Sequence, residues 1–250
     1  DYGSTGSPRG DNSHAEASVY GSSLSVDSDS EYEYGYISAA IAAVDVDSDG
    51  DVDTLYFPVT TAYSPTSEGG GGYTDVTDPG SSWMYKACLD PDDPGDFDWA
   101  EFYDPVDDGS LITRPEVYYS ATTSWHTDGQ LGIYWGTGTP YDRFSSLRGY
   151  FFAVKDDAPM SCTSFTPTPI TDCGANGVYT LRPGEGLTAD PTVYAGVVYF
   201  STWTPAADRC DGGTGRLYGI QFDDCSAGVD TNGDGSVDAS DSDIITSSSS

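Results

Sequence analysis

The chain has 250 residues, which is enough for one large all-β domain or two small ones. It carries 41 acidic residues against 9 basic ones, a formal net charge of −32. Because phosphate binding requires a basic surface, this balance excludes nucleic acid as a partner. Abundant tyrosine, glycine and proline favour strands and turns over helices. No apolar run approaches the roughly 20 residues of a membrane span, so we expect no such span.

Residues 1–35 are rich in serine, glycine and aspartate and contain one weakly apolar stretch, at residues 17–20. We expect a loosely ordered leader here that supplies one strand or none. The sequence does not begin with the basic and apolar regions of a signal peptide. We therefore expect that any secretion signal has been removed.

The most specific motif is an alternating run of aspartates, D-x-D-x-D-G-x-x-D, at residues 45–53. Ca²⁺ takes six to eight oxygen ligands, and alternate residues of a tight loop point that many inward. Gly50 stands at the sixth position, where the backbone turns sharply and a Cβ is costly. An acidic surface turn is the alternative, but it has no need of a glycine there. The motif predicts a calcium site between two strands with these ligand residues: Asp45, Asp47, Asp49, Asp51 through its carbonyl, and Asp53.

Three segments share the order of an opening strand, an apolar-Tyr-aromatic strand and a closing strand. The middle strands read LYF, IYW and VYF, at residues 55–57, 133–135 and 198–200. The opening strands are expected at residues 41–44, 115–118 and 191–194, and the closing strands at residues 83–86, 150–154 and 217–220. A fourth strand is expected in the first two units, at residues 99–103 and 177–181.

Such repeats of short antiparallel strands are typical of radially arranged sheets. We predict an all-β fold over residues 36–225, a partial or modified β-propeller of about three blades with long loops. A ring needs roughly four to eight blades, so either the chain is a piece of a longer protein or other chains complete it. A β-sandwich of irregular strands is the structural alternative.

Five cysteines indicate an oxidising, extracellular location. Because two pairs lie close in sequence, we predict the disulfides Cys162–Cys173 and Cys210–Cys225. Cys88 is then left over, either free and buried or paired outside the chain. No pair has the C-x-x-C spacing of a zinc site.

Four stretches, in this order, resemble the C-terminal propeller region of the PilY-type proteins of type IV pili. They are residues 45–56, residues 134–138 with 148–156, residues 181–185 with 190–193, and residues 198–205 with 210 and 215–220. The resemblance implies a secreted pilus-tip protein that acts in adhesion or pilus assembly. It also implies calcium held by the aspartates of residues 45–53, and pilus components or a host or surface ligand as partners.

The tail, residues 226–250, contains a second acidic loop at residues 230–241. It follows the EF-hand pattern, with aspartate in place of the last, bidentate glutamate. It also resembles the calcium loop of a dockerin, although dockerins carry two copies. We predict a second calcium site there, the alternative being a disordered acidic tail. Its ligand residues would be Asp230, Asn232, Asp234, Ser236 through its carbonyl, Asp238 and Asp241.

The sequence offers little catalytic chemistry. His14 and His126 are the only histidines, and we predict His126 to lie in a solvated turn without a nucleophile beside it. We therefore expect a non-enzymatic, extracellular, calcium-binding propeller segment of a PilY-like protein, at the cell surface or pilus. The alternatives are a structural subunit of an extracellular filament or surface layer that assembles with other chains, and a quinoprotein-like or hydrolytic enzyme.

Overall fold

The computed structural model describes residues 15–18, 23–27, 32–62, 81–89, 97–104, 116–138, 148–208 and 211–249. Across these ranges the chain forms β-strands and two short 3₁₀ helices, with no α-helix. The strands make three antiparallel sheets, none of which closes on itself. The prediction of an all-β fold is confirmed.

The first sheet has the order β1-β2-β3-β5-β6-β7. Its strands are β1 (Ala15–Ser18), β2 (Ser23–Asp27), β3 (Tyr32–Ile37), β4 (Ala42–Val44), β5 (Thr54–Ala62), β6 (Ser81–Leu89) and β7 (Phe97–Tyr103). β4 and β3 pair with the first and the last part of β5, respectively. β1, β2 and the first four residues of β3 thus lie within residues 1–35, where the sequence suggested a loose leader.

The second and third sheets follow in chain order. The second contains β8 (Thr122–Trp125), β9 (Leu131–Gly136), β10 (Tyr150–Asp156), β11 (Pro167–Pro169) and β12 (Val178–Thr180), with the 3₁₀ helices η1 (Thr171–Cys173) and η2 (Ala175–Gly177) before β12. The third contains β13 (Gly186–Leu187), β14 (Thr192–Tyr194), β15 (Val197–Thr204), β16 (Thr214–Gln221) and β17 (Ile244–Ser249). β17 comes from the predicted acidic tail and joins the third sheet beside β16.

The three repeated units of the sequence correspond to the three sheets. Their middle strands are β5, β9 and β15, and their closing strands are β6, β10 and β16. One opening strand was predicted wrongly, because β8 occupies this position in the second sheet instead of residues 115–118. Val117 makes only an isolated bridge to Gly138. A five-residue turn joins β8 to β9, and such a short connection favours hairpin pairing over a distant segment.

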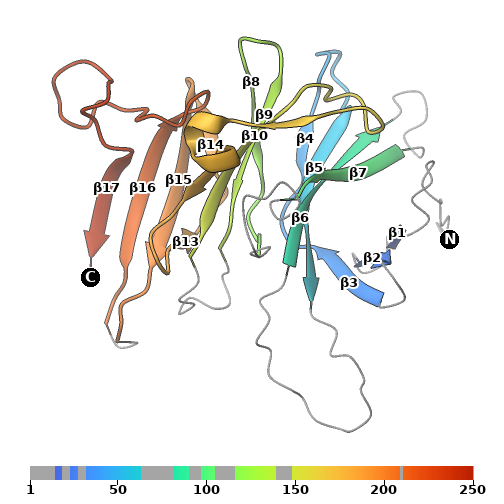
Figure 1. The fold of residues 1–250 in the computed structure, drawn as a ribbon, viewed down its shortest axis with the longest axis horizontal. Helices are drawn as coiled ribbons and strands as arrows, with labels where there is room; N and C mark the ends of the chain where they lie inside the picture. Colours follow the sequence, from blue (N-terminus) through green and yellow to red (C-terminus); the bar gives the residue numbers. More distant parts are fainter. Residues whose placement is uncertain are drawn as a thin grey trace, which may run out of the picture.

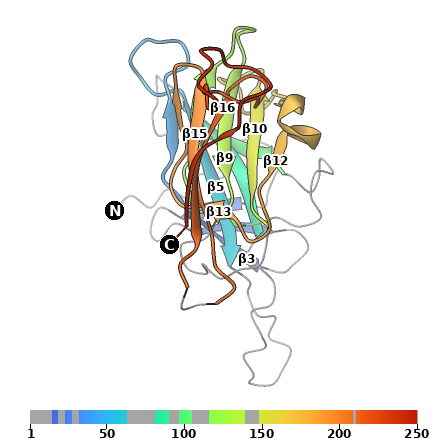
Figure 2. The same ribbon diagram turned by 90° about the vertical axis from the view of Figure 1, so that its left-hand side faces the viewer.

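The sheets pack face to face and bury two successive hydrophobic cores (Figure 1). Seen from the side of the third sheet, β15 and β16 lie in front of β9 and β10 (Figure 2). Side chains alternate along each middle strand, so one strand serves both of its neighbours. On β9, Ile133 and Trp135 enter the core shared with the first sheet, whereas Tyr134 enters the core shared with the third. In that second core Phe200 stacks between Phe151 and Tyr218, with ring centroids 4.2 and 4.7 Å away.

A buried ion pair joins the first sheet to the second. Lys86 Nζ on β6 lies 2.6 Å from Asp156 Oδ2 at the end of β10, and neither side chain is exposed. Lys86 also donates to the carbonyls of Ala158 and Ser161, at 2.7 and 2.8 Å. The hydroxyl of Tyr56 donates to the same Asp156 oxygen at 2.6 Å. Burial lowers the pKa of Lys86, and the hydrogen bond and charge of Asp156 oppose this effect. The buried ammonium group therefore depends on its three acceptors, which are Asp156 and the two backbone carbonyls.

A histidine and a tyrosine join the second sheet to the third. The hydroxyl of Tyr134 donates to the carbonyl of Phe222 just beyond β16, and it also lies 2.6 Å from His126 Nε2. Because the single hydroxyl proton goes to the carbonyl, His126 Nε2 must be the donor to the tyrosine oxygen. The ring of His126 packs against Phe222 with centroids 4.8 Å apart. The prediction of a solvated His126 is wrong, because this packing buries the side chain.

Two disulfides cross the same two interfaces, and both predicted pairings are wrong. Cys88 pairs with Cys162, and Cys173 pairs with Cys225, across 74 and 52 residues of chain. Proximity in sequence misled the prediction, because the packing of neighbouring sheets brings distant cysteines together. Cys210 lies outside the described residues.

Replacing Lys86 by methionine is expected to destabilise the protein by about 3–5 kcal/mol, because the Asp156 carboxylate then stays buried without its cation. Lys155→Met is the matched control. Lys155 pairs with Asp128 at 2.7 Å on the surface, and losing such a pair costs about 0–1 kcal/mol. Urea unfolding measures both variants, and equal losses would contradict the role given to the buried pair.

Burial lowers the pKa of His126, and the nearby charge of Lys155 adds to this effect, while Asp128 and Asp223 oppose it. In the unfolded chain His126 takes up a proton near pH 6.5, whereas in the folded chain it does so only at a lower pH. The contribution of His126 to the free energy of unfolding is therefore present above that pH and falls as the pH is lowered through it.

The measurement is urea unfolding between about pH 7.5 and 5.5, comparing wild type with His126→Gln. The stability advantage of the wild type is expected to shrink toward the acidic end. His14→Gln serves as the control for losing a histidine. A constant difference across this range would contradict the assignment.

Candidate metal centre

The first aspartate run is the hairpin connection between β4 and β5. The ladder closes directly below it, because Val44 pairs with Thr54 and the amide of Asp53 donates to the carbonyl of Val44 at 3.0 Å. Residues 45–53 must therefore turn within a narrow opening. Ser48 and Gly50 take positive φ angles of 65° and 104° to do so. The expected role of Gly50 in a sharp turn is confirmed.

Carboxylates inside this loop accept the backbone amides of the loop itself. Asp45 Oδ2 accepts from the amide of Gly50 at 3.0 Å, and Asp47 Oδ1 accepts from the amide of Asp49 at 3.1 Å. Asp49 Oδ1 accepts from the amide of Asp51 at 2.9 Å. Each bond turns a side chain inward, so the three acidic groups gather around one point.

One carboxylate oxygen from each of Asp45, Asp47 and Asp49 lies within 4.8 Å of the others. No other group of three Asp, Glu, His or Cys side chains in the described ranges converges in this way. Asp45 Oδ1 is buried and accepts no hydrogen bond from the protein. Such an atom is costly unless a cation or a donor reaches it. Partial desolvation, together with the carboxylates of Asp49, Asp53 and Asp45, raises the pKa of Asp47 against one opposing backbone bond.

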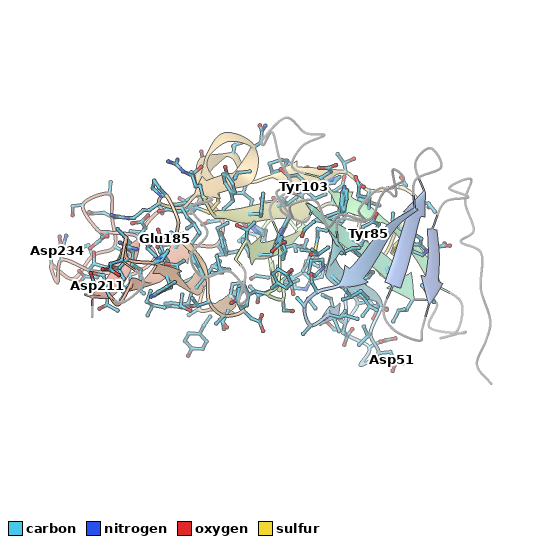
Figure 3. All side chains as sticks on the ribbon, turned by 90° about the horizontal axis from the view of Figure 1, so that it is seen from below. Asp51, Tyr85, Tyr103, Glu185, Asp211 and Asp234 are labelled. Atoms are coloured by element: carbon cyan, nitrogen blue, oxygen red, sulfur yellow. A yellow bond between two sulfur atoms is a disulfide. The ribbon has the colours of Figure 1, made fainter. Side chains whose placement is uncertain are left out.

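Asp53 and Asp51 differ from these three. Asp53 is buried, and its Oδ2 accepts the amides of Val46 and Asp47 at 2.6 and 3.4 Å. Its backbone carbonyl accepts the amide of Leu89 on β6 at 2.8 Å. Asp53 therefore closes the base of the loop with one carboxylate oxygen. Asp51 is exposed at the outer side of the loop, which leaves its carbonyl as its predicted ligand atom (Figure 3).

The second predicted site repeats this pattern of hydrogen bonds between β16 and β17. Asp230 Oδ2 accepts from the amide of Gly235 at 2.8 Å, as Asp45 does from Gly50. Asn232 Oδ1 and Asp234 Oδ1 accept from the amides two residues ahead, each at 2.9 Å. The loops that begin at Asp45 and at Asp230 lie far apart in the sequence, yet they share the same hydrogen bonds over their first seven positions.

The carboxylate of Asp241 closes the second loop. Its Oδ1 accepts the amides of Thr231 and Asn232 at 2.8 and 3.1 Å, which are the positions that Asp53 serves in the first loop. Asp241 is therefore the counterpart of Asp53, although the two stand at different places in the sequence motifs. The pKa of Asp241 is lowered, chiefly by the amide of Asp238. Asp238 Oδ1 accepts from Ser240 instead, and this lowers its pKa.

The two loops lie toward opposite ends of the long axis, as the labels of Asp51 and Asp234 show (Figure 3). Carboxylate and carbonyl oxygens are the ligands of hard cations such as Ca²⁺. The first loop presents three converging carboxylates and a buried oxygen without a donor. The second presents the same backbone conformation, with its predicted ligands Asn232, Asp234 and Asp238 exposed. The backbone amide of Ser236 donates to Asp234 Oδ1, and the predicted ligand atom of Ser236 is its backbone carbonyl.

No protein-family model, curated protein or solved structure matches the chain. The resemblance to PilY-type proteins therefore stays an expectation from the motifs of the sequence. In the described ranges, no helix has both the length and the apolar character required to cross a membrane.

Asp53→Ala is expected to cost about 1–3 kcal/mol even in a chelator, because the amides of Val46 and Asp47 lose their acceptor at the base of the first loop. Asp51→Ala removes the same charge from an exposed side chain and should stay within about 0.5 kcal/mol of wild type. Urea unfolding in excess EGTA measures both. If Asp53→Ala proved neutral without metal, its structural role would be refuted.

Proposed function

We propose that the chain is an extracellular, calcium-stabilised, propeller-like module of a PilY-type pilus protein. The observation that carries the calcium assignment is the convergence of the Asp45, Asp47 and Asp49 carboxylates, of which Asp45 also has a buried Oδ1 that accepts no hydrogen bond from the protein. A divalent cation there would satisfy this oxygen. It would also neutralise carboxylates that otherwise repel one another by about 1–4 kcal/mol per close pair.

The relation between the sheets supports a propeller-like arrangement. The opening strands lie in a row, with β8 beside both β4 and β14. The central tyrosines Tyr56 and Tyr134 each point from their sheet toward the next one. Tyr199 holds the same position in the third sheet, on the face opposite Val198 and Phe200, and no further sheet lies beyond it in the described ranges. This fits a partial propeller that continues in a longer protein or in other chains.

The function of calcium in this module would be mechanical. Asp53 connects the first loop to β6 through Leu89, and the next residue, Thr54, donates its hydroxyl at 2.6 Å to the carbonyl of Pro159, in the connection between β10 and β11 of the second sheet. An ion that orders the loop would therefore stabilise the joint between the first two sheets. The surface presented there would depend on calcium.

Disulfides and acidity favour an extracellular setting for this module. Both disulfides are compatible with an oxidising compartment. Extracellular modules bind calcium with dissociation constants of about 10⁻⁴–10⁻³ M, so exposed loops suffice there. Adhesion or pilus assembly follows from the resemblance of the motifs to PilY-type proteins. It is tested by asking whether the protein copurifies with pili in calcium and separates from them in EGTA.

Calcium is expected to raise the melting temperature, with a stabilisation of about 2.7 kcal/mol at a concentration one hundred times the dissociation constant. Differential scanning calorimetry with CaCl₂ or EGTA measures the stabilisation, and isothermal titration calorimetry gives the affinity. Asp47→Asn removes one converging carboxylate and should weaken one site about tenfold or more, because affinity follows ligand charge.

Asp51→Asn is the matched control, because it keeps the predicted carbonyl ligand and changes only an exposed carboxylate. Its affinity should stay close to that of wild type. An unchanged melting temperature in calcium, with no heat of binding, would rule out the calcium assignment.

A further inference from the structure

The buried pair of Lys86 and Asp156 places an amine directly against a carboxyl group. Lys86 Nζ lies 2.6 Å from Asp156 Oδ2, and neither side chain is exposed. The carboxyl carbon is one bond beyond that oxygen, so no large movement is needed to bring the two groups together. Reacting groups held in this way reach effective concentrations of about 10⁵–10⁸ M.

Aromatic side chains enclose this pair. Lys86 Nζ lies 4.7 Å from the centroid of the Phe165 ring. Phe102 packs against Phe165 and against Tyr56, with ring centroids 6.0 and 5.3 Å away. Two opposite charges are costly in such an enclosed site, whereas a neutral amide with hydrogen-bond partners costs much less. The surroundings therefore favour an amide over the ion pair and protect it from hydrolysis.

The hydrogen bonds of Lys86 direct its nitrogen at the carboxyl group. The carbonyls of Ala158 and Ser161 accept two of its three protons, at 2.7 and 2.8 Å, and the third faces Asp156. Burial lowers the pKa of Lys86, which favours transfer of this third proton to the carboxylate. The lone pair that remains on Nζ then points at Asp156.

The two oxygens of Asp156 have different partners. Oδ1 accepts the amide of Ala158 at 3.0 Å, whereas Oδ2 accepts the hydroxyl of Tyr56 at 2.6 Å in addition to Lys86. Burial and the charge of Asp156 raise the pKa of Tyr56, so its hydroxyl keeps its proton. Oδ1 is thus placed to remain as an amide oxygen, and Oδ2 is placed to leave with Tyr56 as its proton donor.

We propose that Lys86 and Asp156 condense to an isopeptide bond that joins the first sheet to the second. Nζ attacks the carboxyl carbon, the C–N bond forms, and the bond from that carbon to Oδ2 breaks. Two protons of Nζ pass to Oδ2, the first directly and the second through the hydroxyl of Tyr56, so Oδ2 leaves as water. The ion pair is the reactant state, and the reaction requires no oxidant, reductant or cofactor.

This bond goes beyond the proposed function and does not depend on it. Lys86 lies two residues before Cys88, whose disulfide to Cys162 crosses the same interface. The disulfide is lost under reducing conditions, whereas an amide persists. The joint between the first two sheets would therefore keep a covalent link without its disulfide.

Mass spectrometry of the full chain, after reduction and denaturation, tests the proposal. The wild type should be lighter than its sequence by one water molecule, and Lys86→Met should have the full mass of its sequence. Peptide mapping should find one branched peptide that joins Lys86 to Asp156. The reduced wild type should also migrate faster than the variant in a denaturing gel, because the bond closes a loop.

The second lysine of the chain supplies an internal control. Lys155 lies 2.7 Å from Asp128, but these side chains are 19% and 47% exposed. Water keeps this pair ionised and hydrolyses any amide, so Lys155 should remain free. An amine reagent added to the denatured wild type should therefore modify Lys155 but not Lys86.

Full sequence mass together with a reactive Lys86 in the denatured wild type would overturn the proposal. A water loss that persists in Lys86→Met would overturn it equally, because the loss would then come from another site, such as an aspartate that cyclises before a glycine.

Tyr56→Phe tests the path of the second proton, since it keeps the ring and removes only the hydroxyl. In a time course after cell-free synthesis under oxidising conditions, the folded variant should form the bond about a hundredfold more slowly than wild type. A purely structural role of Tyr56 would lower stability but leave the rate in the folded protein unchanged, and that result would refute its part in the reaction.

Discussion

The structure depends on buried hydrogen bonds between neighbouring sheets. Each runs from a tyrosine hydroxyl on the middle strand of one sheet to an acceptor at the end of the closing strand, β10 or β16, of the next. Tyr56 reaches Asp156, and Tyr134 reaches the carbonyl of Phe222, each at 2.6 Å. The two acceptors hold equivalent places, three residues beyond the partners of Tyr134 and Tyr199 in the ladders. A buried hydroxyl requires its acceptor, so each link fixes the register between two sheets that apolar packing alone would allow to slide.

Much of the fold could be predicted from local sequence, because the central tyrosine and its apolar neighbours recur in each unit. Alternation along a strand sends Tyr134 one way and Ile133 and Trp135 the other, and that pattern is visible in the chain. The opening strand β8 was missed because its residues are polar and half-buried, with a weak apolar signal. Only the short turn to β9 identifies it.

The contacts between sheets could not be predicted from local sequence patterns. The disulfides join cysteines more than 50 residues apart, and their pairing follows from which sheet packs on which. Lys86 reads as a surface residue by type, yet it is completely buried because Asp156, 70 positions later, supplies its counter-charge. The convergence of Asp45, Asp47 and Asp49 could be expected because the three residues lie in one short loop, whereas the equivalence of Asp53 and Asp241 is visible only in their hydrogen bonds.

Each acidic loop adjoins a strand that makes few contacts with the rest of its sheet. The first follows β4, a three-residue strand, and the second precedes β17, a polar edge strand. β4 contributes Val44 to the first core and β17 packs Ile244 against the second, so each of these strands buries little apolar surface of its own. A chain with a net charge of −32 also opposes its own compaction, and bound cations would reduce that repulsion at the points where it is concentrated. The central strands are held by tyrosines, an ion pair and disulfides, whereas β4 and β17 lie outside these links and next to the acidic loops.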